Sequence, residues 1–192
     1  MFMSGFTDAF SEATDDQENW EYQISAFPSG LENITSWAED NTSAFELTLV
    51  AQASIAGTTK AIDLKGNDVL SEQDDALHRL NLLEGNLPDS GQSPVQGILD
   101  EGSSELEGYA IGDVITIDFE GEQHDIEIVG IARELSRSIY MHRIDVQPIV
   151  GKEANGALLV TTPSADIEDI RFSTISIVEK ETMVATFEEL ID

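Results

Sequence analysis

Histidines and clustered carboxylates are the side chains of this sequence with the greatest capacity for chemistry. The histidines are His78, His124 and His142, which are widely separated and form no HxH or HExxH pair. A zinc site needs several converging ligands, and the chain contains no cysteine to complete one. We therefore predict no zinc site. His124 is expected on the face of a strand, and His142 near the end of one.

A calcium site is the next candidate, because acidic residues gather between positions 63 and 75. These are Asp63, Asp68, Glu72, Asp74 and Asp75. Carboxylate oxygens suit calcium, but the DxDxDG spacing that wraps a loop around one ion is absent. A solvated acidic surface is therefore the expected role. Acids are so frequent throughout the chain that pairs of carboxylates, which glycosidases use, carry no information here.

Motifs for covalent catalysis and for nucleotide binding are also missing. The sequence contains neither GxSxG nor GxxxxGK[ST]. We predict no catalytic residue, no metal ligand, no cofactor and no enzymatic activity. The one concentration of basic side chains comprises Arg133, Arg137, His142 and Arg143. This group either neutralises the surrounding acids or forms a contact patch for an anionic lipid headgroup or an acidic partner.

The overall charge is strongly negative. Among 192 residues, 38 Asp and Glu oppose 9 Lys and Arg, which gives a net charge of −29, and the first basic residue is Lys60. Such a charge repels phosphate backbones and anionic lipids, so nucleic acid is the least expected partner. An acidic excess fits a halophilic protein, whose surroundings screen the repulsion. The functional alternative is an acidic surface for a basic partner.

Hydrophobic patterns of two periods alternate along the chain and predict an α+β fold. In the first half of the chain we expect a helix with Phe2, Phe6, Phe10 and Trp20 on one face, followed by a strand at 22–27. A second helix should begin with a capping box formed by Ser29 and Glu32. A hairpin of strands at 45–55 and 61–64 and a short helix at 74–82 should follow. After residue 155, strands at 156–162 and 172–178 flank a short turn or helix from Pro163, and a final amphipathic helix begins at Thr182. No apolar run is long enough for a membrane helix, and the start lacks the basic region of a signal peptide.

The segment from Leu82 to Glu134 has the most specific order of parts. It reads as a turn with Gly85 and Pro88, an apolar run at 95–99, a polar helix-like stretch that ends at Gly112–Asp113, and two alternating strands joined at Gly121, the second closing on Val129–Gly130–Ile131. Glycine suits tight turns and positive φ, because it has no Cβ to clash. The residue types alone predict a hairpin with one helix.

This order resembles the small inserted subdomain in the extracytoplasmic region of MacB/FtsX-like ABC transporter permeases. The positions that carry the resemblance are Gly85, Pro88, Gly112, Asp113, Val129 and Gly130, with Gly66 and Asp68 of a Gly-x-Asp triplet earlier in the chain. The resemblance implies a helical stalk at 1–20, an α/β lobe of β-α-β units at 21–83 and 135–181, a small inserted mainly-β lobe at 84–134, and a helix at 182–192 that leads to the next membrane span. The fold class expected is therefore α+β with two lobes.

The same resemblance implies a role in transport without catalysis. The chain would be the periplasmic or cell-surface domain of a permease subunit, joined to the membrane through flanking helices absent from this chain. A cytoplasmic ABC ATPase subunit or domain would drive it, and the domain would couple ATP hydrolysis to an extracytoplasmic partner or substrate, in export, lipoprotein release or cell-wall regulation. The alternative is a free-standing secreted acidic module that binds a cationic ligand.

Overall fold

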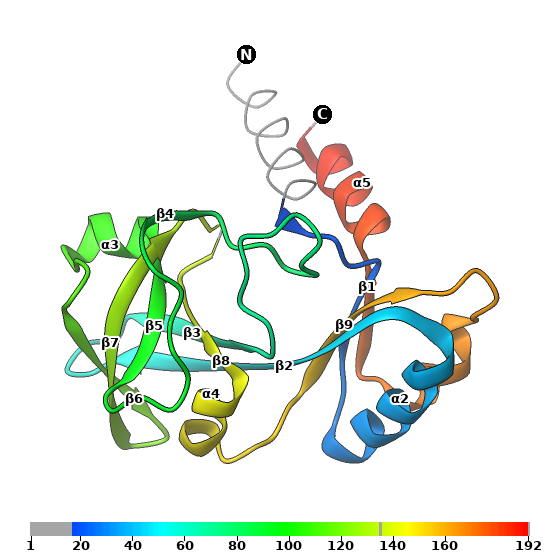
Figure 1. Ribbon diagram of the computed structural model, residues 1–192, viewed down its shortest axis with the longest axis horizontal. Helices are drawn as coiled ribbons and strands as arrows, with labels where there is room; N and C mark the ends of the chain where they lie inside the picture. The colour runs from blue at the N-terminus through cyan, green and yellow to red at the C-terminus, as the bar shows by residue number, and fades with distance from the viewer. Residues whose placement is uncertain (1–16, 135, 192) are drawn as a thin grey trace. The chain divides into compact units, whose positions relative to one another are not determined.

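The computed structural model describes residues 17–134 and 136–191, and it has the expected α+β fold (Figure 1). The chain divides into two compact units. Unit 1 comprises Met1–Glu46, Gln73–Arg79 and Asn155–Asp192, and its described part begins at Gln17. Unit 2 comprises Leu47–Glu72 and Leu80–Ala154. The predicted helical stalk at 1–20 lies mostly outside the described residues, and Asn19 and Trp20 are not helical.

Unit 1 is built on antiparallel strands with helices beside them. Strand β1 (Tyr22–Ser25) pairs with β9 (Gly156–Thr161) on one side and with β10 (Ser176–Glu179) on the other. The accompanying helices are α2 (Pro28–Asn41), the 3₁₀ helix η1 (Ile167–Ser173) and α5 (Lys180–Ile191). Helix α2 turns Leu31, Ile34 and Ala38 into the core, as the helical spacing predicts.

Helix α2 does not begin with the predicted capping box. Its N-cap is Phe27, which makes no side-chain cap bond, and Pro28 occupies the first turn. Proline is favoured there because its φ is already helical and it has no N–H to satisfy. Ser29 therefore lies inside the helix and cannot cap it. The predicted strand at 172–178 is shorter than expected, because Phe172 belongs to η1 and β10 begins at Ser176.

Unit 2 is a closed sheet. Its strands are β2 (Thr42–Ile55), which begins in unit 1, β3 (Ala61–Asn67), β4 (Leu82–Gly85), β5 (Val95–Asp100), β6 (Val114–Phe119), β7 (Glu122–Ala132) and β8 (Ser138–His142). The pairing order β2–β3–β8–β5–β7–β6 returns to β2, because Ser54 and Ile55 pair with Asp118 and Ile117. Closing a sheet in this way removes most of its free edges. Strand β4 adds to the end of β7.

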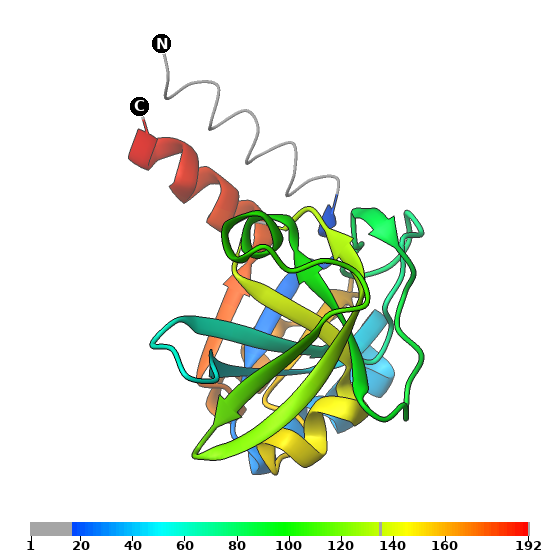
Figure 2. The same cartoon turned by 90° about the vertical axis from the view of Figure 1, so that its left-hand side faces the viewer.

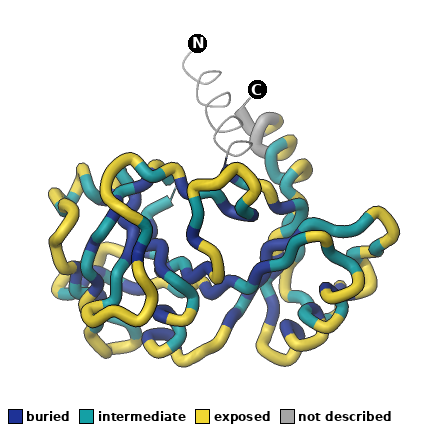
Figure 3. The backbone as a smooth tube through the Cα atoms, viewed as in Figure 1, coloured by how far each residue is buried: buried dark blue, intermediate teal, exposed yellow. Residues whose placement is uncertain are grey.

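The core of unit 2 lies inside this ring of strands. Inward residues from both halves of the sequence share one cluster, including Leu49, Leu64, Ile117, Ile128 and Ile139. Figure 3 colours the buried segments of the backbone dark blue. Helix α3 (Glu101–Glu107) follows β5, and α4 (Arg143–Val150) packs against β3 and β8.

This division of the chain differs from the predicted lobes at 21–83 with 135–181 and at 84–134. Strands β3 and β8 were expected in the α/β lobe, but their parallel pairing brings Leu64 beside Ile139 in the core of unit 2. The inserted segment therefore completes a sheet to which residues 47–72 and 136–154 also contribute.

The predicted short helix at 74–82 is wrong. Residues 73–81 form turns and isolated bridges, and β4 begins at Leu82. Leu77 and Leu80 have the i, i+3 spacing of a helix face, but they serve two different cores. Leu77 packs with Trp20 and Leu158 in unit 1, whereas Leu80 packs with Leu70 and Ile98 in unit 2. One face of a single helix could not place these two leucines in two different cores.

Candidate functional site: the root of the terminal helix

Gly85 and Gly130, which were singled out in the sequence, occupy tight positions in unit 2. Gly85 has a φ of +87°, and a Cβ added there would lie 2.2 Å from the carbonyl oxygen of Val129. A Cβ at Gly130 would lie 2.7 Å from Asn86 O. These contacts let β4 approach β7, where Asn86 N donates to Val129 O at 3.0 Å. Side chains at Gly85 and Gly130 would therefore separate the two strands.

Gly112 and Asp113 form the turn that leads into β6. Gly112 has a φ of +91° and donates its N–H to Ile128 O at 2.8 Å. The Asp113 carboxylate accepts the N–H of Ala110 at 2.8 Å, and Asp113 O accepts the N–H of Ile128 at 2.9 Å. The pair fixes the register between β6 and β7, which is an architectural function and not a chemical one.

Gly66, Asp68 and Pro88 gather around the start of α4. A Cβ at Gly66 would lie 3.0 Å from Cα of Arg143, so the glycine allows α4 to approach β3. Asp68 accepts a hydrogen bond from Arg143 Nε at 2.7 Å, and Pro88 O lies 3.0 Å from His142 Nε2. These contacts join the segments after β3 and β4 to the end of β8.

The predicted basic contact patch is divided by β8. Arg133 and Arg137 lie against α3, where they pair with Glu101 at 3.3 Å and Glu107 at 3.2 Å. His142 and Arg143 lie at the opposite end of β8. Each of the three arginines is paired with a carboxylate. These pairs are the arrangement that neutralisation of nearby acids predicts.

Among the residues that the structure describes, no cluster of His, Asp and Glu has the arrangement of a metal site. His124 lies on β7 and His142 ends β8, as predicted from the strand patterns. His78 is buried and lies in unit 1, where its Nδ1 contacts Glu18 Oε1 at 2.9 Å. Glu18 belongs to a segment that is bonded to two distant parts of unit 1.

We define the junction as residues 17–21, 73–79 and Lys180. The segment 17–21 is bonded to the 73–79 loop through its backbone: Arg79 N donates to Gln17 O at 2.7 Å and Asn19 N to Leu77 O at 2.9 Å. The side-chain amide of Asn19 adds bonds to Asp74 O and Ala76 O, both at 2.8 Å. The loop therefore holds the segment that leads into β1.

The start of α5 is bonded to the same segment. Lys180 donates its backbone N–H to Glu21 O at 3.0 Å and its ammonium to Glu18 O at 2.9 Å. The Glu18 carboxylate accepts hydrogen bonds from Trp20 Nε1 and from His78. Figures 1 and 2 show β1 and α5 meeting at this end of the unit 1 sheet.

An apolar cluster lies beneath these bonds. Trp20, Leu77 and Leu158 are buried together, and Val178 and Met183 pack against them. The Glu21 carboxylate ties the cluster to β9 by accepting from both the N–H and the hydroxyl of Thr161, at 2.8 and 2.6 Å. Each such bond contributes about 1 kcal/mol net. The chain segments before β1 and after β10 are therefore fixed to one another and to the sheet.

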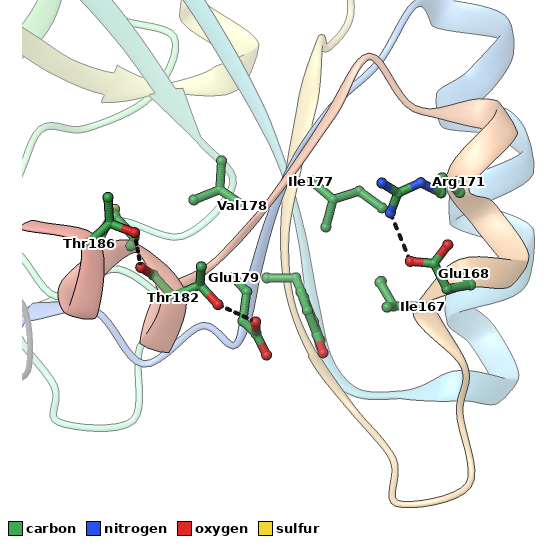
Figure 4. Close-up of a pocket in the computed structure, with 10 residues that line it drawn as sticks. Ile167, Glu168, Arg171, Ile177, Val178, Glu179, Thr182 and Thr186 are labelled. Carbon is green, nitrogen blue, oxygen red and sulfur yellow. Dashed lines mark hydrogen bonds and ion pairs between the residues drawn. The ribbon is translucent and has the colours of Figure 1, made fainter.

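A hollow of about 580 Å³ opens beside the root of α5, between η1, β10 and the helix (Figure 4). Ile167 and Ile177 line the apolar part of this hollow. The carboxylate of Glu179 also lines the hollow and accepts a hydrogen bond from the hydroxyl of Thr182. Tyr22 also lines it; burial, and then the charges of neighbouring carboxylates, raise the pKa of its phenol above the ordinary 10.0.

Together, the closed sheet of unit 2 and the helix-flanked sheet of unit 1 define a two-unit α+β domain in which the start of α5 is bonded to the segment before β1. No family model and no curated protein sequence matches the chain. Its fold is shared by solved structures, two of which have TM-scores above 0.5 to it. One is the periplasmic region of MacB from Actinobacillus actinomycetemcomitans, with a TM-score of 0.57, 12% identity, and coverage of 91% of this chain and 94% of that one.

The other is the extracellular domain of the noncanonic ABC-type transporter YknZ from Gram-positive bacteria. It has a TM-score of 0.53 and 14% identity, and the match covers 88% of this chain and 94% of that one. The chain therefore has the fold of the periplasmic region of MacB and of the extracellular domain of YknZ, as the resemblance of the inserted segment predicted. No helix in residues 17–134 and 136–191 is long and apolar enough to span a membrane.

Sequence reasoning missed the junction. Glu18, Asn19 and His78 follow no catalytic or metal-binding spacing, and His78 lies 60 residues from its partner. The available signal was the Trp20–Glu21 pair next to an alternating strand, together with a leucine at position 77 in an acidic loop. These residues are recognised as one site only after the fold brings them together.

Proposed function

We propose that this chain is the extracytoplasmic domain of an ABC transporter permease subunit of the MacB/FtsX-like type. The observation that carries the proposal is the likeness of the fold over about nine-tenths of the chain to two such domains, and over 94% of each of theirs. The order of glycine turns in the inserted segment supports it independently, since that order suggested the same family from the sequence.

In this proposal the junction transmits motion. Membrane helices before β1 and after α5 move when an ABC ATPase subunit or domain binds and hydrolyses ATP. The junction ties both chain segments to the β1–β9–β10 sheet through Glu18, Glu21 and Lys180. A displacement of either segment is therefore transmitted to unit 1 as a whole. A loosely attached domain would absorb the same displacement in its linkers.

In this proposal the motion of unit 1 acts on an extracytoplasmic partner protein or substrate, in export, lipoprotein release or cell-wall regulation. We assign the domain no catalytic role and no cofactor. The acidic charge of −29 argues against nucleic acid as a partner. The domain lies on the periplasmic or cell-surface side, and it reaches the membrane through helices that flank this chain.

The test uses the full-length natural protein in its own membranes. An affinity tag is expected to recover an ATP-binding subunit, and hydrogen exchange in β1 and β10 is expected to differ between the ATP-bound and ADP-bound complex. Asn19→Ala removes two side-chain bonds of the junction and should reduce that difference. Asn86→Ala is the matched control, because Asn86 is exposed in unit 2. Recovery of the protein from the soluble fraction, with no ATP-binding subunit, would contradict the proposal.

A further inference from the structure

Unit 1 exposes three large apolar side chains that its own core does not use. Phe172 is 103% exposed, Phe27 70% and Ile175 58%. We call these three residues the aromatic rim. Single exposed apolar residues are ordinary on a protein surface, but apolar residues that gather at one place mark contact sites.

The fold brings the three residues to one place. Phe27 is the N-cap of α2, and Phe172 lies near the end of η1. These ends meet because buried Gly30 lets Ser173 O approach, so that a Cβ at Gly30 would lie 2.0 Å from that oxygen. Ile175 donates its N–H to Ser25 O at 2.7 Å, two residues before Phe27. Figure 1 shows η1 in orange beside α2.

The elements that carry the aromatic rim are rich in exposed acids. The exposed carboxylates on α2 and around η1 are Glu32, Glu39, Asp40, Asp166, Glu168 and Asp169. Helix α2 contains no lysine or arginine, and Arg171, the basic residue of η1, is already paired with Glu168 at 2.7 Å. The surface therefore combines apolar anchors with a negative field. It complements a segment that carries the opposite combination, namely apolar residues beside lysine or arginine.

The net charge of the chain also indicates which kind of partner would bind the aromatic rim. A second copy of this chain carries the same −29, so self-association at the aromatic rim brings like charges together. An anionic bilayer is repelled for the same reason. We propose that the aromatic rim is a docking surface for a basic amphipathic segment of a partner protein, with Phe172 and Phe27 as the apolar anchors. None of the three residues belongs to the junction, and the surface adjoins the hollow beside α5, which Glu168 and Arg171 also line.

The probe is a synthetic 18-residue helical peptide of leucine and lysine, labelled with a fluorophore, and binding is followed by anisotropy. The wild-type chain should bind it with an affinity that falls as salt rises. Phe172→Ser should weaken binding by about tenfold or more, as loss of an aromatic anchor does. Leu106→Ser is the matched control, because Leu106 on α3 of unit 2 is 77% exposed and should leave binding unchanged.

Folding is not at risk in these variants, because each removes a side chain that contacts little. Phe27→Ser is a second variant at the same surface, and serine is a favourable N-cap there. Equal binding by wild type, Phe172→Ser and Leu106→Ser would overturn the proposal, since only non-specific attraction would then remain. Sedimentation that shows a dimer lost in Phe172→Ser, or binding to anionic vesicles lost in the same variant, would also overturn it. The proposed role in transport does not depend on either result.

Discussion

Replacing Gly30 with alanine tests the packing that holds α2 against η1. In an unconstrained helix this change stabilises by about 1 kcal/mol, because glycine loses more backbone entropy than alanine. Here the new Cβ would lie 2.0 Å from Ser173 O, a separation that non-bonded atoms do not tolerate. The obstacle is a backbone oxygen, so no change of rotamer relieves it. Either α2 or the end of η1 must move.

The cost of that movement exceeds the helical gain. Overpacking of this kind costs about 1–3 kcal/mol. The displacement also strains the bond from Asn33 Nδ2 to Ser173 Oγ and the bond from Ile175 N to Ser25 O. Each contributes about 1 kcal/mol. After the gain in helix propensity is subtracted, we expect Gly30→Ala to lower the free energy of unfolding of unit 1 by about 1–3 kcal/mol.

Tryptophan fluorescence during urea unfolding measures this loss in unit 1 alone. The chain has two tryptophans, Trp20 and Trp37, and both belong to unit 1. Ser36→Ala is the control, because Ser36 is exposed on the same helix and its replacement should change stability by less than about 0.5 kcal/mol. An unfolding midpoint for Gly30→Ala at or above that of wild type would refute the packing argument.

Three further predictions concern other contacts. Gly85→Ala should accelerate hydrogen exchange in β4 and the facing end of β7, whereas Gly57→Ala, with a similar positive φ but open space around it, should leave those amides unchanged. Lys60→Gln should raise the carboxyl pKa of Glu107 toward 4.5 in an NMR titration, because the hydrogen bond from Lys60 lowers this pKa in the wild type. The wild-type pair therefore stabilises the fold above pH 4.5, and this stabilisation is lost as the pH falls through the lowered pKa. The ultraviolet titration of wild type minus that of Tyr22→Phe should give a phenol pKa above 10.0, and a difference curve centred at or below 10.0 would count against the burial of Tyr22.

Local patterns predicted many of the elements correctly. The alternation at 45–55 and at 115–131 corresponds to strands β2, β6 and β7, because alternate residues of the three strands, such as Ala53, Ile117 and Ile128, are buried in one core. The glycine turns in the inserted segment were also predictable from the sequence, because a positive φ or a close approach requires glycine at Gly85 and Gly112. These features depend on neighbours in sequence.

Features that depend on distant segments were not predictable in the same way. The closure of unit 2 rests on β6 pairing with β2 and on β3 pairing in parallel with β8. No local pattern encodes either register. The predicted helix at 74–82 failed because Leu77 and Leu80 pack into different cores. The junction depends on the same effect, since Glu18 and His78 become neighbours only in the folded unit.

The side of the membrane on which the domain lies tests the central proposal most directly. The chain has no cysteine, so a single Thr59→Cys in the exposed turn between β2 and β3 introduces the one thiol of the domain. In intact cells that express the full-length protein, labelling by a membrane-impermeant maleimide is compared before and after lysis. The account predicts that Thr59→Cys is labelled in intact cells, with little gain after lysis. Labelling that appears only after lysis would place the domain in the cytoplasm and contradict the account.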